Sequence, residues 1–144
     1  MVCPSSNYLL SKRVVAVLKS QNLPEHKFFP ARLIGTKGDP IDGYSFFYLP
    51  SLHEDHIAFT RSQFSAGDNS KGYKDIMVTS ADDLFKVDDF LNVKKVALQN
   101  TSSSLDLIKV KLPIGLLASP KLQAALAALD VTGIKIKKME VEFI

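Results

Sequence analysis

The chain has 144 residues, of which 46% are hydrophobic, and this is enough apolar sequence for one domain, which we expect to span residues 1–144. Its 18 basic and 15 acidic residues leave a formal charge of +3, and the basic residues are scattered along the chain. This pattern does not indicate a nucleic-acid-binding protein, because that class needs clustered Lys and Arg. No apolar run approaches the roughly 20 residues of a membrane span, so we expect no membrane association.

The first residues and the cysteine content indicate a cytoplasmic protein. The opening stretch, MVCPSSNYLL, has neither the basic region nor the long apolar run of a secretory signal. Cys3 is the one cysteine of the chain and cannot form an internal disulfide, which fits a reducing compartment. Its neighbours offer no histidine or helix start to activate the thiol, so we do not expect Cys3 to be catalytic.

The first predicted element is an amphipathic helix that begins after Ser11, a residue type that caps helix N-termini. Its apolar stripe is predicted at Val14, Val15 and Leu18, with Gln21 one turn further on. A strand-like run, KFFPARLI, follows beyond Pro24. Its apolar residues change parity midway, which we interpret as a β-bulge near Pro30.

Strands and turns dominate the middle of the chain. We predict a loop at GTKGDPIDG, followed by aromatic and β-branched strands at YSFFYLP and HIAFTRSQF. A polar loop is predicted at SAGDNSKGYKD, leading into a strand at IMVTS. Further strands are expected at VKKVALQ and LDLIKVKL, with a turn at NTSSS between them.

A short acidic helix is predicted over residues 81–91. Ser80 and Asp83 have the spacing of a capping box, and the apolar side of the helix would consist of Leu84, Val87 and Leu91.

The helix pattern of the N-terminus recurs near the C-terminus, in LLASPKLQAALAALDV. Here Ser119 is the expected cap and Pro120 the first helical residue, and an offset of 108 residues places Ser11 on Ser119. The apolar stripe is predicted at Leu122, Ala125, Leu126 and Leu129. A strand with a second parity change, IKIKKMEVEF, follows Gly133, so we interpret the two helix-strand units as a structural repeat. The predicted class is α+β, with a mostly antiparallel sheet covered by a few helices and similar helix-strand units near the two termini.

No set of residues in the sequence has the spacing of a catalytic or cofactor site. His53 and His56 flank Glu54 and Asp55, but a transition-metal site needs further ligands, and strand alternation would separate the two imidazoles. Phosphate-loop and nucleophile-elbow motifs are missing as well. We therefore expect no metal, no cofactor and no enzymatic activity. Two alternatives stay open: a hydrolase with a site around His53 and His56, and a small nucleic-acid-binding or regulatory domain that would use the lysines of IKIKK.

The C-terminal stretch resembles a known signature. LLASPKLQAALAALDVTGIKIKKMEV is similar to the C-terminal region of family eleven of the bacterial polymorphic-toxin immunity proteins, formerly a domain of unknown function. The likeness consists of the apolar pair Leu116 and Leu117, a capping serine, a helix rich in Ala and Leu, and the Thr132–Gly133 turn before an apolar strand. The N-terminal unit and HIAFTRSQF also resemble the layout of that family. The resemblance implies a toxin inhibitor of interbacterial competition, which binds a co-encoded toxin and protects the producing cell and its siblings, without shared catalytic residues.

One segment is the strongest candidate for contact with such a toxin. ADDLFKVDDF concentrates negative charge, and a cleft built for phosphates attracts an acidic inhibitor. We predict that the carboxylates supply the charge and that Phe85 or Phe90 serves as an anchor; the acidic candidates are Asp82, Asp83, Asp88 and Asp89. The alternatives are a merely solvated helix, and contact through the polar loops around Gly38 and Asp68.

Overall fold

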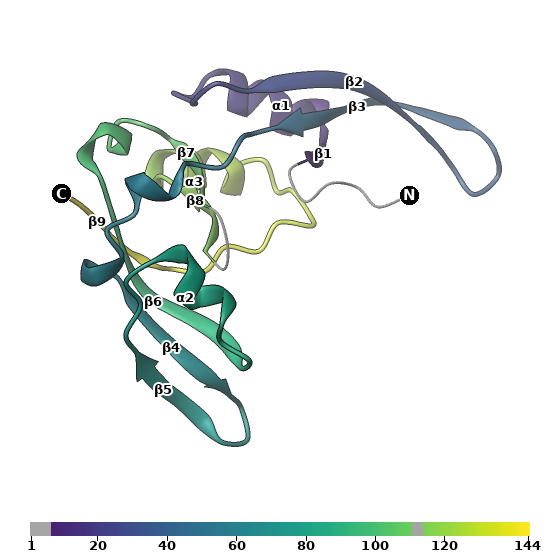
Figure 1. Cartoon of the computed structure of the whole chain (residues 1–144). Coiled ribbons are helices and arrows are strands. Elements are labelled where there is room, and N and C mark those ends of the chain that lie inside the picture. Colours follow the sequence, from purple (N-terminus) through teal and green to yellow (C-terminus); the bar gives the residue numbers. More distant parts are fainter. Residues whose placement is uncertain (1–6, 111–113) are drawn as a thin grey trace. The chain divides into compact units, whose positions relative to one another are not determined.

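The computed structural model describes residues 7–110 and 114–144, which form an α+β fold with mostly antiparallel sheets (Figure 1). This confirms the predicted class. Cys3 and the last two residues of the predicted strand LDLIKVKL, Lys111 and Leu112, lie outside the described residues.

The chain divides into two compact units, each assembled from three separate stretches. Unit 1 consists of Met1–Ser51, Leu105–Lys109 and Leu116–Lys135. Unit 2 consists of Leu52–Ser104, Val110–Gly115 and Ile136–Ile144.

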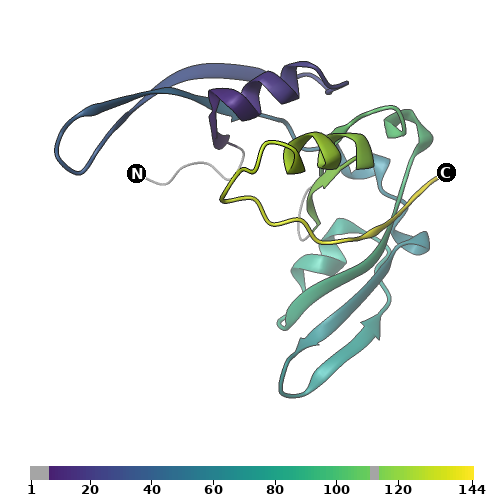
Figure 2. The same cartoon turned by 180° about the vertical axis from the view of Figure 1, so that it is seen from behind.

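Unit 1 contains a three-stranded antiparallel sheet of order β1-β3-β2 and two helices. Its elements are β1 (Asn7–Ser11), α1 (Lys12–Lys19), β2 (Lys27–Ile34), β3 (Pro40–Tyr48) and α3 (Pro120–Ala127). α1 lies along the sheet, and the β2–β3 hairpin extends beyond both α1 and β1 (Figure 2). The loop predicted at GTKGDPIDG is shorter than expected, because β3 already begins at Pro40.

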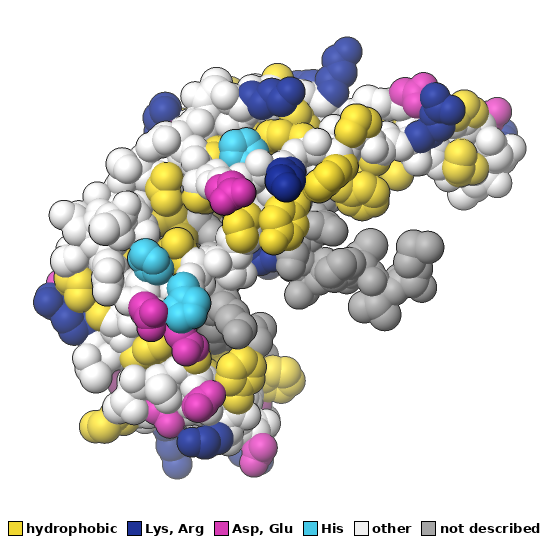
Figure 3. Space-filling view, turned by 45° about the horizontal axis from the view of Figure 1, so that its top comes forward, with side chains coloured by type: hydrophobic (Ala, Val, Ile, Leu, Met, Phe, Trp, Pro, Cys, Tyr) yellow, Lys and Arg dark blue, Asp and Glu magenta, His cyan; other side chains and the backbone are white. Residues whose placement is uncertain are grey.

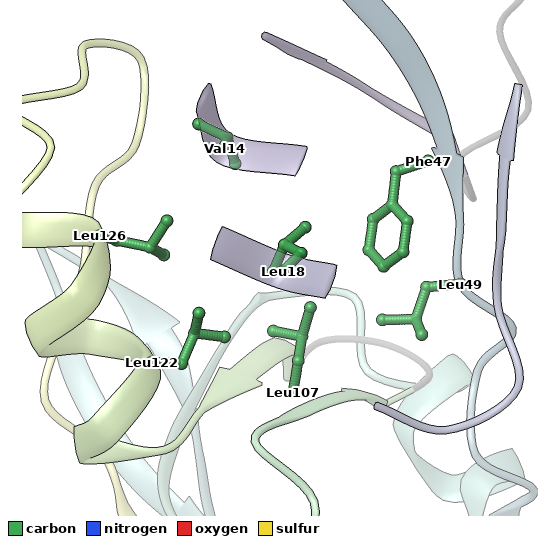
Figure 4. Close-up of a cluster of buried hydrophobic side chains, with 7 residues drawn as sticks. All are labelled: Val14, Leu18, Phe47, Leu49, Leu107, Leu122 and Leu126. Atoms are coloured by element: carbon green, nitrogen blue, oxygen red, sulfur yellow. The ribbon is translucent and has the colours of Figure 1, made fainter. Parts of the chain in front are cut away.

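The two helices of unit 1 confirm the predicted helix pair and share one core. α1 and α3 begin and end 108 residues apart, the offset at which the sequence repeats. Their equivalent residues meet in the core: Val14 and Leu18 of α1 lie against Leu122 and Leu126 of α3 (Figure 4). The cluster is completed by Phe47, Leu49 and Leu107.

Polar contacts at the helix ends show that the pair is antiparallel. Near the start of α1, Arg13 donates to the carbonyl of Leu129, just beyond the end of α3, at 2.6 Å. At the start of α3, Lys121 donates to Asp106, which also accepts from the backbone N–H of Asn22, just beyond the end of α1. Each helix therefore begins beside the end of the other.

The predicted bulge is present, but its extra residue lies in β3. Ala31 pairs with Tyr44 and Leu33 with Ile41, so two steps along β2 match three steps along β3. Gly43 lies within this longer segment with φ of 90°, a conformation that glycine adopts without a side-chain clash. Pro30 is in the regularly paired part of β2. Placing the extra residue beside Pro30 was wrong, because β2 is an edge strand and tolerates a missing donor without a bulge.

Unit 2 contains a four-stranded sheet of order β5-β4-β6-β9, in which β9 runs parallel to β6. The strands and the helix of this unit are β4 (Gln63–Asp68), β5 (Gly72–Ile76), α2 (Ala81–Phe85), β6 (Phe90–Leu98) and β9 (Glu140–Phe143). Three short 3-10 helices accompany them: η1 (Glu54–His56), η2 (Phe59–Arg61) and η3 (Asn100–Ser102). The core is built from buried side chains that include Ile57, Phe64, Leu84, Val96 and Leu98. A separate two-stranded sheet pairs β7 (Leu107–Val110) with β8 (Gly115–Ala118), and all residues of these strands except Val110 and Gly115 belong to unit 1.

Two predicted strands of the central region were wrong in extent. HIAFTRSQF contains the last residue of η1 and all of η2 before β4 begins at Gln63. The Ser62 hydroxyl accepts from the N–H of Ala97 and donates to the carbonyl of Ala58, so a side chain takes the place of a strand partner. In IMVTS, β5 ends at Ile76.

The polar stretch SAGDNSKGYKD is a hairpin, not a loop. β4 and β5 pair through most of it, and only its centre turns. The Asp68 carboxylate accepts from the backbone N–H groups of Ser70 and Lys71, which closes the turn.

The predicted C-terminal strand also begins later than expected. Residues 134–139 lie outside any strand, and β9 starts at Glu140. The parity change in IKIKKMEVEF, which by the same reasoning predicted a second β-bulge, falls in the segment that precedes the strand, so that prediction was wrong. Lys95 binds Glu142 at 2.7 Å across β6 and β9, and Arg61 also pairs with Glu142.

Candidate functional site

The predicted acidic helix is shorter than expected and its residues separate into two roles. α2 ends at Phe85, and Phe90 already belongs to β6, so the helix predicted to residue 91 was wrong at its C-terminal end. The segment ADDLFKVDDF instead forms a five-residue helix, a short turn and the first residue of a strand. Leu84 is the buried contact of α2.

Asp83 belongs to the capping box of α2. Its Oδ2 accepts from the backbone N–H and hydroxyl of Thr79, at 2.9 and 2.8 Å, and from the N–H of Ser80 at 3.1 Å. These hydrogen bonds, those from Thr79 above all, lower the pKa of Asp83 to about 2. Asp83 therefore fixes the start of the helix, and its charge is partly used within the protein.

The remaining acidic and aromatic candidates face solvent. Asp82, Asp88 and Asp89 are exposed and, within the described part of the chain, their carboxylates make no hydrogen bond or ion pair. Phe85 is 59% exposed and Phe90 is 74% exposed. We call these five residues the acidic surface. Exposed phenylalanines next to unpaired carboxylates are not needed for the core, so this surface is available to a partner.

The structure places the two histidines in different surroundings. His53 Nδ1 lies 2.9 Å from Asp55 Oδ2, and both side chains are largely exposed. His56 is half-buried, and its Nδ1 is enclosed without a hydrogen-bond partner. Among residues 7–110 and 114–144, no group of three or more His, Cys, Asp or Glu side chains could hold a metal ion.

The two loops considered as alternative contact sites differ in what they offer. Gly38 lies in the exposed turn of the β2–β3 hairpin, with φ of 85°. Asp68 is used inside the β4–β5 turn, where its hydrogen bonds with Ser70 and Lys71 lower the pKa of its carboxyl group. The Asp68 carboxylate is therefore partly occupied by its own turn.

Charge is distributed unevenly between the two units. Unit 1 carries nine basic and five acidic residues, whereas the described residues of unit 2 carry eight basic and ten acidic ones. The mild formal charge of the whole chain therefore hides a basic unit and a slightly acidic one. The acidic surface belongs to the acidic unit.

A second exposed surface, in unit 1, was not predicted from the sequence. Leu9, Phe46 and Phe29 are paired in one row across β1, β3 and β2, and they are 41%, 38% and 51% exposed. We call this row, together with the neighbouring outward pairs Lys27–Tyr48, Ala31–Tyr44 and Leu33–Ile41, the aromatic face. Figure 3 shows hydrophobic side chains gathered along the β2–β3 hairpin.

A signal for the aromatic face is present in the sequence. Both KFFPARLI and YSFFYLP contain two adjacent phenylalanines. Adjacent strand residues point to opposite faces, so one phenylalanine of each pair must point outward if the other is in the core. Phe47 is in the core and Phe28 packs against it, which leaves Phe46 and Phe29 outside.

No protein-family model matches the chain, and a search of the curated proteins finds no match either. None of the helices in the described ranges combines the length and apolar character needed to cross a membrane.

Proposed function

We propose that this protein is an immunity protein, which binds a bacterial toxin in the cytoplasm and neutralises it to protect the producing cell and its siblings. Two things support the proposal. One is the resemblance of the C-terminal stretch LLASPKLQAALAALDVTGIKIKKMEV to family eleven of the immunity proteins, and the other is the acidic surface. The acidic surface carries the argument, because Phe85 and Phe90 are exposed among carboxylates that have no internal role.

The composition of the acidic surface fits a protein partner. Aromatic side chains supply much of the binding energy at interfaces, and a stable interface needs roughly 800 Å² from each partner with a few such anchors. The carboxylates of Asp82, Asp88 and Asp89 are free to face opposite charge, which speeds association and disfavours wrong partners. We therefore expect the toxin to present a basic surface with an apolar pocket.

Expression of the toxin encoded beside this gene tests the proposal. We expect cells that produce the toxin to survive when they also produce the wild-type protein, and the two proteins to co-purify. The triple variant Asp82→Asn, Asp88→Asn, Asp89→Asn should bind the toxin at least tenfold more weakly, because it loses three charges of the interface. Phe85→Ser should weaken binding by a similar factor.

The control is a triple variant with the same change in charge on unit 1: Glu25→Gln, Asp39→Asn and Asp130→Asn, all at exposed positions. This variant should keep the wild-type affinity. If the wild-type protein neither binds the toxin nor rescues growth, the immunity function is wrong. If rescue is normal in both triple variants and in Phe85→Ser, the function stands and the acidic surface is not the contact site.

A further inference from the structure

The aromatic face departs from the usual pattern of a half-covered sheet. In an antiparallel sheet with one solvated face, the outward residues are normally polar. The inward face of this sheet packs on the core through Phe47, with Tyr8 and Phe28 beside it. The outward row is Leu9, Phe46 and Phe29, which places two exposed phenylalanine rings on neighbouring strands. A contiguous exposed patch of this kind marks an interaction surface.

The end of the β2–β3 hairpin exposes apolar side chains on both sides, next to the exposed ion pair of Arg32 and Asp42. β1 pairs with β3 as far as Tyr44, so beyond this residue the hairpin is two-stranded. Ile41 pairs with Leu33 on the outward side, and Ile34 occupies the next row on the opposite side. Ile34 is 68% exposed and Ile41 is 45% exposed. Because a two-stranded ribbon is only marginally stable in water, such an end is stabilised when another chain covers it.

The charge and the spacing of the exposed side chains indicate that the chain which covers this hairpin end is a second copy of the same protein. Among the paired outward residues that the structure describes, Lys27 is the one charged side chain, and it lies at the far end of the sheet from the hairpin turn. Unit 1 as a whole is basic, so two copies repel each other least when they meet through a face whose one charged paired residue, Lys27, lies at its far end. A face with so little charge can stack on itself, and interfaces between identical subunits are more apolar than other protein interfaces.

We propose that two copies of this chain pair through the aromatic face, with their β2–β3 hairpins antiparallel across a two-fold axis. The paired residues Ala31 and Tyr44 lie midway between two apolar rows: Phe29 with Phe46 on one side, Leu33 with Ile41 on the other. An axis at Ala31 and Tyr44 stacks Phe46 on Ile41 of the partner subunit. Each two-stranded hairpin end is then covered by the aromatic row of the other copy.

The size of the interface explains why the whole hairpin is involved. A stable dimer buries roughly 800 Å² on each partner, which is more than one row of three side chains provides. Stacking along the full hairpin adds the Leu33 and Ile41 row and the central pair. The proposal does not depend on the immunity function, because it concerns unit 1 and can be tested with the purified chain alone.

The mass of the protein in solution gives the first test. We expect the wild-type chain to sediment as a dimer in analytical ultracentrifugation at micromolar concentration. Phe29→Asp should reduce the mass to that of one chain, because a carboxylate would be buried in the stack. The matched control is Phe90→Asp, which changes an exposed strand phenylalanine of unit 2 and should leave the dimer intact. A wild-type protein that stays a single chain up to submillimolar concentration overturns the proposal, as does a Phe29→Asp dimer.

Chemical cross-linking gives a second test that does not depend on a disruptive variant. In a Cys3→Ser background, Ala31→Cys places a thiol beside the proposed axis, where stacked sheets are roughly 10 Å apart. A short bismaleimide should then link two chains covalently. The control Ala16→Cys lies on the exposed side of α1 and should give no cross-linked dimer at the same concentration. Equal cross-linking at both positions, or none at Ala31→Cys, would contradict the two-fold arrangement.

Discussion

Asp106 is the residue on which the polar contacts of unit 1 converge. Its side chain accepts from the N–H of Asn22 at 2.9 Å, from the hydroxyl of Ser119 at 2.7 Å and from the ammonium of Lys121 at 3.0 Å. Its backbone N–H and carbonyl also pair with Asn22 and Ser119. The residue is only 7% exposed. These hydrogen bonds, the one from Asn22 first, lower the pKa of Asp106 to about 2.

We predict that Asp106→Asn lowers the melting temperature by several degrees at neutral pH, because an amide nitrogen cannot accept one of the three hydrogen bonds. The folded-state pKa of Asp106 lies below its usual 3.8, so its stabilising effect is present above about pH 4 and is lost as the pH falls toward 2. The difference in urea midpoint between the wild type and Asp106→Asn should therefore be large at pH 7 and shrink toward pH 2. The exposed Asp39→Asn is the control and should change neither value. A difference that stays constant from pH 7 to pH 2 would disprove this account of Asp106.

The importance of Asp106 could not be predicted from the sequence. Its partner Asn22 is 84 positions away, and no periodic pattern or local motif joins them. Asp83 is the contrasting case, because its cap is formed within four residues and the Ser80 spacing predicted it correctly. Local hydrogen bonds leave a pattern in the sequence, whereas contacts that depend on the fold do not.

The two repeated helices differ in how they are capped. In α3 the hydroxyl of Ser119 accepts from the N–H of Leu122 at 3.1 Å. The equivalent Ser11 makes no side-chain cap to α1, and it is the last residue of β1. The sequence shows a serine before each helix, so it predicted both helices correctly and their different caps not at all.

This difference predicts unequal effects of the same substitution at equivalent positions. Ser119→Ala should lower the free energy of unfolding by about 1 to 2 kcal/mol, since it removes the cap and the hydrogen bond to Asp106. Ser11→Ala should cost no more than about 0.5 kcal/mol, because no cap is lost. Chemical denaturation of the two variants measures both values. Equal losses would show that the cap at Ser119 does not stabilise α3.

At the level of elements, the sequence predicted helices better than it predicted strands. The helices at both termini have stripes of buried residues at helical spacing, and such stripes depend on local geometry. HIAFTRSQF has strand-like composition, but the Ser62 hydroxyl and the bridge from Ile57 to Leu98 supply the pairing that a strand would have used. The acidic helix stopped early because Phe90 and Leu91 pair with Gly67 and Ala66 in β4, a contact that lies outside any local pattern.

At the level of the whole molecule, the two units are interleaved along the chain. Unit 1 takes segments from the N-terminal third, from residues 105–109 and from 116–135, and unit 2 takes the stretches between and after them. The apparent N-terminal module, residues 1–51, therefore holds only part of its own core. Composition alone indicates one domain, because no linker or shift in composition separates the units. The central row of the aromatic face also depends on the fold, because only the pairing of three strands brings Leu9, Phe46 and Phe29 together.

The interleaving predicts that a fragment of residues 1–51 does not fold alone. Three of the seven core residues of unit 1, Leu107, Leu122 and Leu126, come from outside this fragment. Without them Val14 and Leu18 would be left exposed, and an apolar side chain loses about 1.5 to 3 kcal/mol when it is not buried. A small domain has little stability to spare, so the fragment should show no cooperative thermal transition and little dispersion of its amide NMR signals. The full chain is the matched control and should give both. A cooperative transition in the fragment would mean that the β1-β3-β2 sheet and α1 are stable without α3, and that the shared core is not what holds unit 1 together.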